Sequence, residues 1–192
     1  MRIIAGIYKN RALTCPKGGQ TRPTSGLLRG AVFNICQMRM EGATFLDLFA
    51  GSGAMGIEAL SRGASFATFI EADRESFKCI KKNIETLDIA SQTSVLHGDV
   101  FRLIESLAKH QHRYSIIYAD PPYDSKIKTP LGEMTYSSYI VHLVDQYALL
   151  EPGGLLLIED SISSTPIQEN LQNLRFKNSR GRGRSVLQQY EG

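Results

Sequence analysis

The stretch "TFLDLFAGSGAMGIEALSRG", residues 44–63, decides the fold class of this chain. It begins as an apolar run of strand length and continues as a helix that ends at Gly63. Between the two lie three glycines at the GxGxxG spacing, Gly51, Gly53 and Gly56. Such glycines let backbone amides at a helix N-terminus approach a bound ligand closely. The segment therefore predicts the first strand, ligand loop and helix of a βαβ unit.

The same alternation continues along the chain. Further strands are expected at residues 66–72, 93–98, 114–119 and 153–160, and further helices at 74–87, 100–110, 137–150 and 166–174. Residues 175–192 are expected to form two last strands around a Gly/Arg turn. Strands separated by helices of about ten residues favour an α/β fold with a mostly parallel sheet covered on both faces. In such sheets the ligand lies at the carboxyl ends of the strands.

Residues 1–43 differ from this pattern. Two short apolar runs around "YKN" predict a hairpin, a Gly/Pro/Thr loop follows, and residues 27–39 have the composition of a helix. We therefore expect a small N-terminal extension over residues 1–43 and the main α/β domain over residues 44–192.

Composition restricts the class of protein. The chain has 192 residues, 42% hydrophobic and 21% charged, which suits one compact domain with a small extension. It has no apolar run of about 18 residues and no signal-peptide pattern, so we expect a cytoplasmic protein without a membrane segment. Cys15, Cys36 and Cys79 form no CxxC pair, and His110 and His112 are typical of a solvated turn. No metal site is expected.

The net charge of +3 is unevenly distributed. Residues 1–43 carry seven Lys or Arg and one acid, residues 175–192 carry five and one, and residues 44–174 carry ten and seventeen. Basic ends around an acidic middle are typical of a protein that binds a polyanion. Two ordinary solvated termini remain the alternative.

Acidic residues at three strand ends indicate the kind of cofactor. The negative charge of Asp47 would be unfavourable beside a pyrophosphate but suits a cationic ligand. S-adenosylmethionine is such a ligand, because it carries a sulfonium and an ammonium without a phosphate. A structural acid bonded to nearby amides is the alternative for Asp47. Glu71 can accept hydrogen bonds from ribose hydroxyls of either NAD or S-adenosylmethionine. Asp99 can accept from an adenine amino group, cap the helix that follows, or do both.

The sequence "DPPY", Asp120 to Tyr123, ends the strand at 114–119. The Asp120 carboxylate and the Pro121 carbonyl can accept hydrogen bonds from an exocyclic amine of a nucleobase, which favours a pyramidal, nucleophilic nitrogen. Tyr123 can stack on a base that has been taken out of its helix. Asp120 can also take the proton that the amine loses. The alternative is a proline-rich turn with an exposed tyrosine.

Taken together, the motifs "RIIAG" (2–6), "RPTSGLLRGAVFN" (22–34), "DLFAGSGAMGIEALSRGA", "IEADR" and "DPPY" are similar to the RsmD family. Its members are class I S-adenosylmethionine-dependent methyltransferases that act on a guanine N2 in 16S ribosomal RNA. The resemblance covers nearly the whole chain and implies a Rossmann-like fold, with a seven-stranded sheet whose last strand is antiparallel. It also implies a substrate within the small ribosomal subunit or its assembly intermediate. We further expect a protein that acts as a monomer, and an N-terminal extension that covers the RNA and cofactor site.

The resemblance also implies roles for particular residues. Those expected to bind the cofactor are Asp47, Gly51 and Gly53 at its methionine part, Glu71 at the ribose, and Asp99 and Val100 at the adenine. Phe49 of the same loop is also expected to bind the cofactor. The catalytic set is Asp120, Pro121, Pro122 and Tyr123. RNA contacts are expected from Arg2, Lys9, Arg11, Arg22, Arg29, Arg180, Arg182 and Arg184.

Two segments carry further expectations. The family pattern has an acid where this chain has Gly26 and again where it has Gly30, which weakens the expected helix by about 1 kcal/mol for each interior glycine. Residues 124–136 are a candidate lid beside the base site.

Three other functions compete with an RNA guanine-N2 methyltransferase. A DNA adenine-N6 methyltransferase would use the same "DPPY" turn, but 192 residues leave little room for a separate sequence-reading domain. An NAD-dependent oxidoreductase explains the glycines and Glu71 but gives Asp47 and "DPPY" no task. A non-catalytic RNA-binding subunit would bind no cofactor at all.

Overall fold

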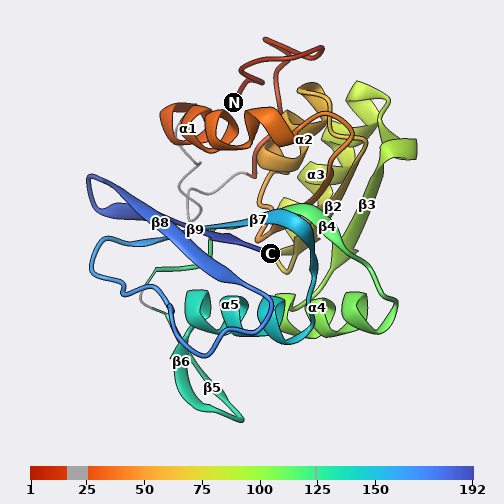
Figure 1. Cartoon of the computed structure of the whole chain (residues 1–192). Coiled ribbons are helices and arrows are strands. Elements are labelled where there is room, and N and C mark those ends of the chain that lie inside the picture. The colour runs from red at the N-terminus through yellow and green to blue at the C-terminus, as the bar shows by residue number, and fades with distance from the viewer. Residues whose placement is uncertain (17–25, 124) are drawn as a thin grey trace. The chain divides into compact units, whose positions relative to one another are not determined.

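In the computed structural model, which describes residues 1–16, 26–123 and 125–192, residues 44–61 form a strand, a loop and a helix as predicted (Figure 1). The chain divides into two compact units, Met1–Val100 and Phe101–Gly192, which are described in turn. The expected division into an N-terminal extension (residues 1–43) and a main domain (residues 44–192) remains a prediction.

The sheet of the first unit has the strand order β3-β2-β1, and both pairs are parallel. Its elements are β1 (Thr44–Leu48), α2 (Ala54–Ser61), β2 (Phe66–Glu71), α3 (Arg74–Leu87), the short 3-10 helix η2 (Ala90–Gln92) and β3 (Thr93–His97). The expected strands and helices of this region are confirmed to within two residues. Parallel pairing brings the carboxyl ends of β1, β2 and β3 to one edge, which is where the predicted ligand site lies.

Local chemistry explains the two helices of this sheet. All of α2 is buried, and at Gly56 an added Cβ would lie 2.3 Å from the ring of Phe69 on β2, so only glycine permits this close approach. Helix α3 begins at Asp73, whose carboxylate accepts the Ser76 N–H at 2.8 Å. It ends at Asp88, which adopts the left-handed conformation with φ of 57°.

The N-terminal extension is fixed to α2 by a buried acid. Residues 1–13 form a narrow hairpin-like loop with a bridge between Arg2 and Ala12, and α1 (Gly26–Cys36) and the 3-10 helix η1 (Gln37–Arg39) follow. The fully buried Glu58 of α2 accepts the backbone N–H groups of Ile4 and Ala5, at 2.7 and 3.0 Å. The expected hairpin and helix are confirmed, the latter despite its two glycines.

The sheet of the second unit has the strand order β4-β7-β9-β8. Its elements are α4 (Val100–Lys109), which begins at the last residue of the first unit, β4 (Tyr114–Ala119), β5 (Lys126–Thr129), β6 (Gly132–Thr135), α5 (Tyr136–Gln146), β7 (Leu150–Ser161), β8 (Arg175–Arg182) and β9 (Ser185–Glu191). Strands β4 and β7 are parallel, and β9 runs antiparallel to both of its neighbours. The two expected last strands and the antiparallel last strand are therefore confirmed.

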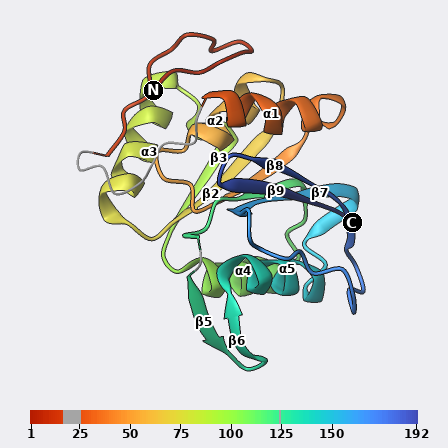
Figure 2. The same ribbon diagram turned by 90° about the vertical axis from the view of Figure 1, so that its left-hand side faces the viewer.

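The segment between β4 and α5 forms an antiparallel hairpin. Strands β5 and β6 pair from Lys126 with Thr135 to Thr129 with Gly132, and the hairpin projects beside α5 (Figure 2). Whether the segment 124–136 acts as a lid stays a prediction, and Asp124 lies outside the described residues.

The helix expected over residues 166–174 is wrong. This segment is irregular, because the buried Asp145 of α5 accepts the backbone N–H groups of Gln172, Asn173 and Leu174 at distances of 2.7 to 3.0 Å. A side chain thus satisfies the donors that a helix would direct to its own carbonyls.

Within the described residues, no helix is long and apolar enough to cross a membrane.

Candidate active site

The loop after β1 has an unusual backbone. Phe49, Gly51 and Gly53 have φ angles of 60°, 56° and 79°, in the left-handed region. The glycines adopt this conformation without strain, whereas Phe49 is held in it by its surroundings. No atom lies within 4 Å of the place where a Cβ of Gly51 would be, so this part of the loop offers bare backbone to a ligand.

Asp47 ties the end of β1 to the start of α2. Its carboxylate is buried, at 1% exposure, and accepts the Gly56 N–H at 3.0 Å. An acid beside a helix N-terminus is favoured by the helix dipole. The structural alternative foreseen for Asp47 is thus present, and its contact with a cofactor stays a prediction.

Glu71 connects the end of β2 to the glycine loop. Its Oε2 accepts the Gly51 N–H at 2.6 Å and its Oε1 accepts the Asp73 N–H at 2.7 Å. A carboxylate has about four acceptor positions, so each oxygen keeps one for a further donor such as a hydroxyl. Beyond the neighbouring β3, Asp99 is exposed and immediately precedes α4, which begins at the buried Val100.

Asn83 of α3, which the sequence reasoning missed, holds the loop from beneath. It is 2% exposed, and its amide nitrogen donates to the carbonyls of Ser52 and Thr14, at 3.0 and 2.9 Å. Its Oδ1 accepts the Thr14 N–H at 2.8 Å. A signal was available, because Asn83 lies between the apolar positions Ile80, Ile84 and Leu87 that form the buried stripe of this helix.

The charge of these strand ends restricts the ligand. Residues 47–53, 71–73 and 97–100 contain four acids and no Lys or Arg. Carboxylates that face a ligand favour hydroxyl and ammonium donors and disfavour phosphates. The first unit is therefore suited to a nucleoside that carries positive charge rather than a pyrophosphate.

In the second unit, the turn after β4 holds a tyrosine by its hydroxyl. Asp120 is half-buried, Pro121 is buried, Pro122 is exposed and Tyr123 is 39% exposed. The Tyr123 hydroxyl donates to Oε1 of the buried Glu159 on β7. The base of the following hairpin is closed where the Tyr136 N–H donates to the Ser125 carbonyl at 3.1 Å.

Several effects keep the Tyr123 phenol protonated. Burial raises its pKa most, the hydrogen bond to Glu159 and the charge of that carboxylate raise it further, and the charge of Asp120 adds to this. A hydrogen bond with Ser185 acts in the opposite direction. The structure thus brings Asp120 and Tyr123 together and adds Glu159, for which the only sequence signal is an acid after the apolar run "GLLLI".

The residues predicted to contact RNA differ in their exposure. Exposed side chains are Arg2, Lys9 and Arg11 on the N-terminal extension and Arg180 and Arg184 on the β8–β9 hairpin. Arg22 and the side chain of Arg182 lie outside the part of the chain that the structure describes.

For Arg29 the expectation needs correction. Its side chain is 3% exposed, and its Nη2 donates to the Arg2 carbonyl at 2.8 Å. Desolvation by burial lowers its pKa. This arginine fastens α1 to the N-terminal strand segment and does not present its charge at the surface.

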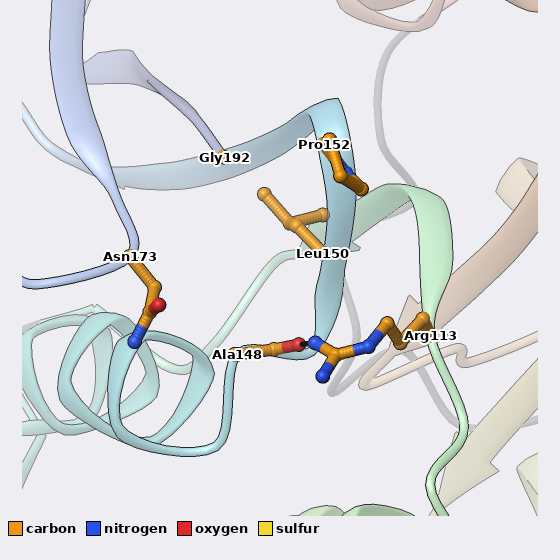
Figure 3. A pocket seen from close by; sticks show the side chains of 6 residues that line it. All are labelled: Arg113, Ala148, Leu150, Pro152, Asn173 and Gly192. Atoms are coloured by element: carbon orange, nitrogen blue, oxygen red, sulfur yellow. Dashed lines mark hydrogen bonds between the residues drawn. The ribbon is translucent and has the colours of Figure 1, made fainter.

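A pocket in the second unit lies away from these residues. It has a volume of about 460 Å³ and is lined by Arg113, Ala148, Leu150, Pro152, Asn173 and Gly192 (Figure 3). Arg113 precedes the start of β4, whereas Asp120 follows its end, and the guanidinium of Arg113 donates to the Ala148 carbonyl. None of the predicted site residues lines this pocket. Within the described ranges no group of three or more His, Cys, Asp or Glu is placed to hold a metal ion.

Comparison with known proteins gives consistent matches. The family model described as "Conserved hypothetical protein 95" matches residues 1–191. The chain is 38% identical over 164 residues to "Ribosomal RNA small subunit methyltransferase D" of Escherichia coli strain K12, covering 85% of this chain and 76% of the other. It is 35% identical over 160 residues to "Putative rRNA methyltransferase YlbH" of Bacillus subtilis strain 168, covering 83% and 82%.

Solved structures agree on the fold. The structure described as "Putative methyltransferase yhhF from Escherichia coli" superposes with a TM-score of 0.79 at 27% identity, covering 100% of this chain and 97% of the other. The predicted Rossmann-like methyltransferase fold is therefore confirmed.

Proposed function

The chain belongs to the ribosomal RNA small subunit methyltransferase D family, as its motifs predicted, and from this premise we propose that it methylates the N2 amine of a guanine in 16S ribosomal RNA with S-adenosylmethionine as donor. The observation that carries the proposal is the turn Asp120 to Tyr123 at the carboxyl end of β4, with its acid and its anchored aromatic ring.

The residues of the first unit fit S-adenosylmethionine. When bound, this cofactor supplies an electrophilic methyl group on a sulfonium. We assign the loop from Phe49 to Gly53, with its open backbone at Gly51, to the methionine part, with the Asp47 charge nearby, and the two open acceptor positions of Glu71 to the ribose hydroxyls. Asp99 and Val100 are assigned to the adenine. The absence of Lys and Arg from these strand ends supports this choice over NAD.

The turn after β4 is proposed to bind and activate the target base. An exocyclic amine is a poor nucleophile, because its lone pair is delocalised into the ring. The Asp120 carboxylate and the Pro121 carbonyl accept its two N–H groups and so favour the pyramidal nitrogen of the transition state. Pro121 and Pro122 keep the turn rigid, since proline fixes φ and restricts the residue before it. Tyr123 stacks on the flipped base.

Asp120 is also the proposed acceptor of the proton that the amine releases. In-line displacement needs the attacking nitrogen, the methyl carbon and the sulfur to be collinear, and such alignment supplies about 7–11 kcal/mol of the barrier. The chain's residues thus orient the reactants and receive one proton, directly or through water.

Recognition of the RNA is proposed to rest on phosphate contacts. The exposed basic residues are Arg2, Lys9 and Arg11 of the extension and Arg180 and Arg184 of the β8–β9 hairpin. From the sequence alone we add Arg22 and Arg182 to the proposed contacts. Phosphate contacts fix orientation, and folded RNA is recognised largely by shape. We further propose that residues 1–43 cover the site of the domain 44–192, and that a cytoplasmic monomer acts on the assembling small subunit.

The test is methyl transfer from labelled S-adenosylmethionine to unmodified small ribosomal subunits, naked ribosomal RNA and duplex DNA, followed by identification of the labelled nucleoside. Label in N2-methylguanosine from subunits is the expected result. Label in N6-methyladenine from DNA would retain the chemistry and overturn the substrate, and a lack of transfer to all three would refute the proposal.

A further inference from the structure

Two tyrosine hydroxyls of the second unit meet at one carboxylate. Glu159 of β7 is 6% exposed, its Oε2 accepts the hydroxyl of Tyr118 on β4 at 3.2 Å, and its Oε1 accepts the hydroxyl of Tyr123. In the register of β4 and β7, Ala119 pairs with Ile158. Glu159 is therefore the first residue of β7 beyond that pair, at the level where the turn begins.

Burying the Glu159 carboxylate lowers the stability of the folded protein. A carboxylate loses its hydration when buried, and a cation or several strong donors normally offset the loss. The partners of Glu159 in the described structure are two neutral phenols, and among the described residues it forms no ion pair with a Lys or Arg. Its bond to the rigid Tyr118 also fixes the direction in which Oε1 faces Tyr123.

The adjacent Asp160 offers a contrast. It is equally buried, at 3% exposure, but its oxygens accept the Ser161 N–H at 2.7 Å and the Ser164 hydroxyl at 2.6 Å. Successive residues of a strand point to opposite faces. Asp160 therefore binds groups at the end of β7 and in the loop after it, whereas Glu159 binds the turn after β4.

The contact with Glu159 acts on the part of Tyr123 that is not needed for stacking. The hydroxyl is anchored and stays protonated, while the residue as a whole remains 39% exposed. An exposed aromatic side chain on a turn otherwise samples several rotamers, and fixing one in advance removes that entropy cost from substrate binding.

We propose that Glu159 is a positioning residue for methyl transfer, which holds the Tyr123 ring in the orientation that stacks on the target base. This rests on the function proposed above. It extends the site beyond the turn itself to the neighbouring strand, and it makes the Tyr123 hydroxyl the atom through which Glu159 acts.

The experiment compares Glu159→Gln, Glu159→Ala, Tyr123→Phe and the double variant Tyr123→Phe/Glu159→Ala with the wild type. Asp160→Asn is the matched control, because it changes an equally buried carboxylate of the same strand. Steady-state transfer to small ribosomal subunits gives kcat and KM, S-adenosylhomocysteine titration reports the cofactor site, and thermal unfolding reports folding.

We expect Glu159→Ala to lower kcat/KM for the RNA substrate by about thirtyfold, since small misplacements in an active site cost up to about a hundredfold. Glu159→Gln, whose amide oxygen can still accept one phenol, should lose less. The affinity for S-adenosylhomocysteine should stay within twofold of the wild type. Tyr123→Phe should lower kcat/KM about as much as Glu159→Ala does. The double variant should lose no more than either single variant, because both changes remove the same hydrogen bond.

Two kinetic outcomes would overturn the inference. One is a kcat/KM of Glu159→Ala equal to that of Asp160→Asn, and the other is a double variant in which the losses of Glu159→Ala and Tyr123→Phe multiply. A fluorescence measurement keeps the inference testable if the wild type fails to methylate subunits. The protein has no Trp, and a carboxylate hydrogen bond quenches tyrosine emission. Glu159→Gln must then raise the emission, and Tyr123→Phe must reduce that rise, or the anchoring contact is absent.

Discussion

The buried amide of Asn83 allows a prediction about both folding and cofactor binding. Alanine at this position removes three hydrogen bonds, two to the backbone of Thr14 and one to the Ser52 carbonyl in the glycine loop. A buried hydrogen bond contributes about 0.5–1.5 kcal/mol, so the free energy of unfolding should fall by about 3 kcal/mol. For a domain of this size, that lowers Tm by about 6–12 °C.

The same change should weaken cofactor binding. Without Asn83 the loop must be ordered when the ligand binds, and fixing one residue costs about 1–2 kcal/mol, so the affinity for S-adenosylhomocysteine should fall about tenfold. Calorimetric titration at a temperature well below Tm measures this affinity separately from folding. Thr86→Ala is the control, because Thr86 is exposed on the same helix and its hydroxyl donates to the Lys82 carbonyl of its own helix.

Asn83→Asp adds a sharper comparison. The carboxylate retains the acceptor for the Thr14 N–H and loses both donors, so it should resemble alanine in its effect on the loop. If Asn83→Ala has the Tm and the affinity of Thr86→Ala, Asn83 does not support the loop and the reasoning is refuted.

The remaining predictions concern the turn, the surface and the first turn of α3. Asp120→Ala should lower turnover at least about a hundredfold with nearly unchanged affinity for S-adenosylhomocysteine, and equal turnover would remove its assigned role. Replacing Arg180, Arg182 and Arg184 together by Ala should weaken RNA binding and reduce the slope of log affinity against log salt by up to about 0.7–0.9 for each lost contact; an unchanged slope would make them ordinary solvent-exposed residues. Asp73→Ala should cost about 1 kcal/mol of unfolding free energy at neutral pH. The hydrogen bond from the Ser76 N–H lowers the pKa of Asp73 in the folded protein. The contribution of Asp73 to stability is therefore complete above its unfolded pKa of about 4 and is lost as the pH falls through the lower folded value. If the difference in unfolding free energy between variant and wild type does not shrink in urea titrations at acid pH, this reasoning is contradicted.

Much of the fold was predictable because its signals are local. The helix over residues 74–87 was predicted to the residue, since an N-capping Asp73 and an apolar stripe define it within one stretch of chain. The strand at 114–119 was likewise predicted to the residue, because an apolar run ends just before an acid that precedes proline. The loop between β1 and α2 followed from three glycines at a fixed spacing.

The failures share a different cause. Residues 166–174 have helical composition, yet the backbone N–H groups of the last three bond to Asp145, which is more than 20 residues away in the sequence. Arg29 looked like a surface cation in a basic segment, but folding buries it against the Arg2 carbonyl. Neither outcome is visible in a local pattern, because each depends on which distant group the side chain meets.

The sequence by itself determined the α/β class, most of the order of strands and helices, the family, and the residue types at the strand ends, because periodicity, turn residues and short motifs are properties of neighbouring positions. Only the tertiary structure decided which polar groups are paired. It buried Asp47 on the Gly56 amide, joined Asn83 to the glycine loop and set Glu159 beneath the Tyr123 hydroxyl. The physical reason is that a buried polar group must find its partner in space, and the chain folds distant residues into those places.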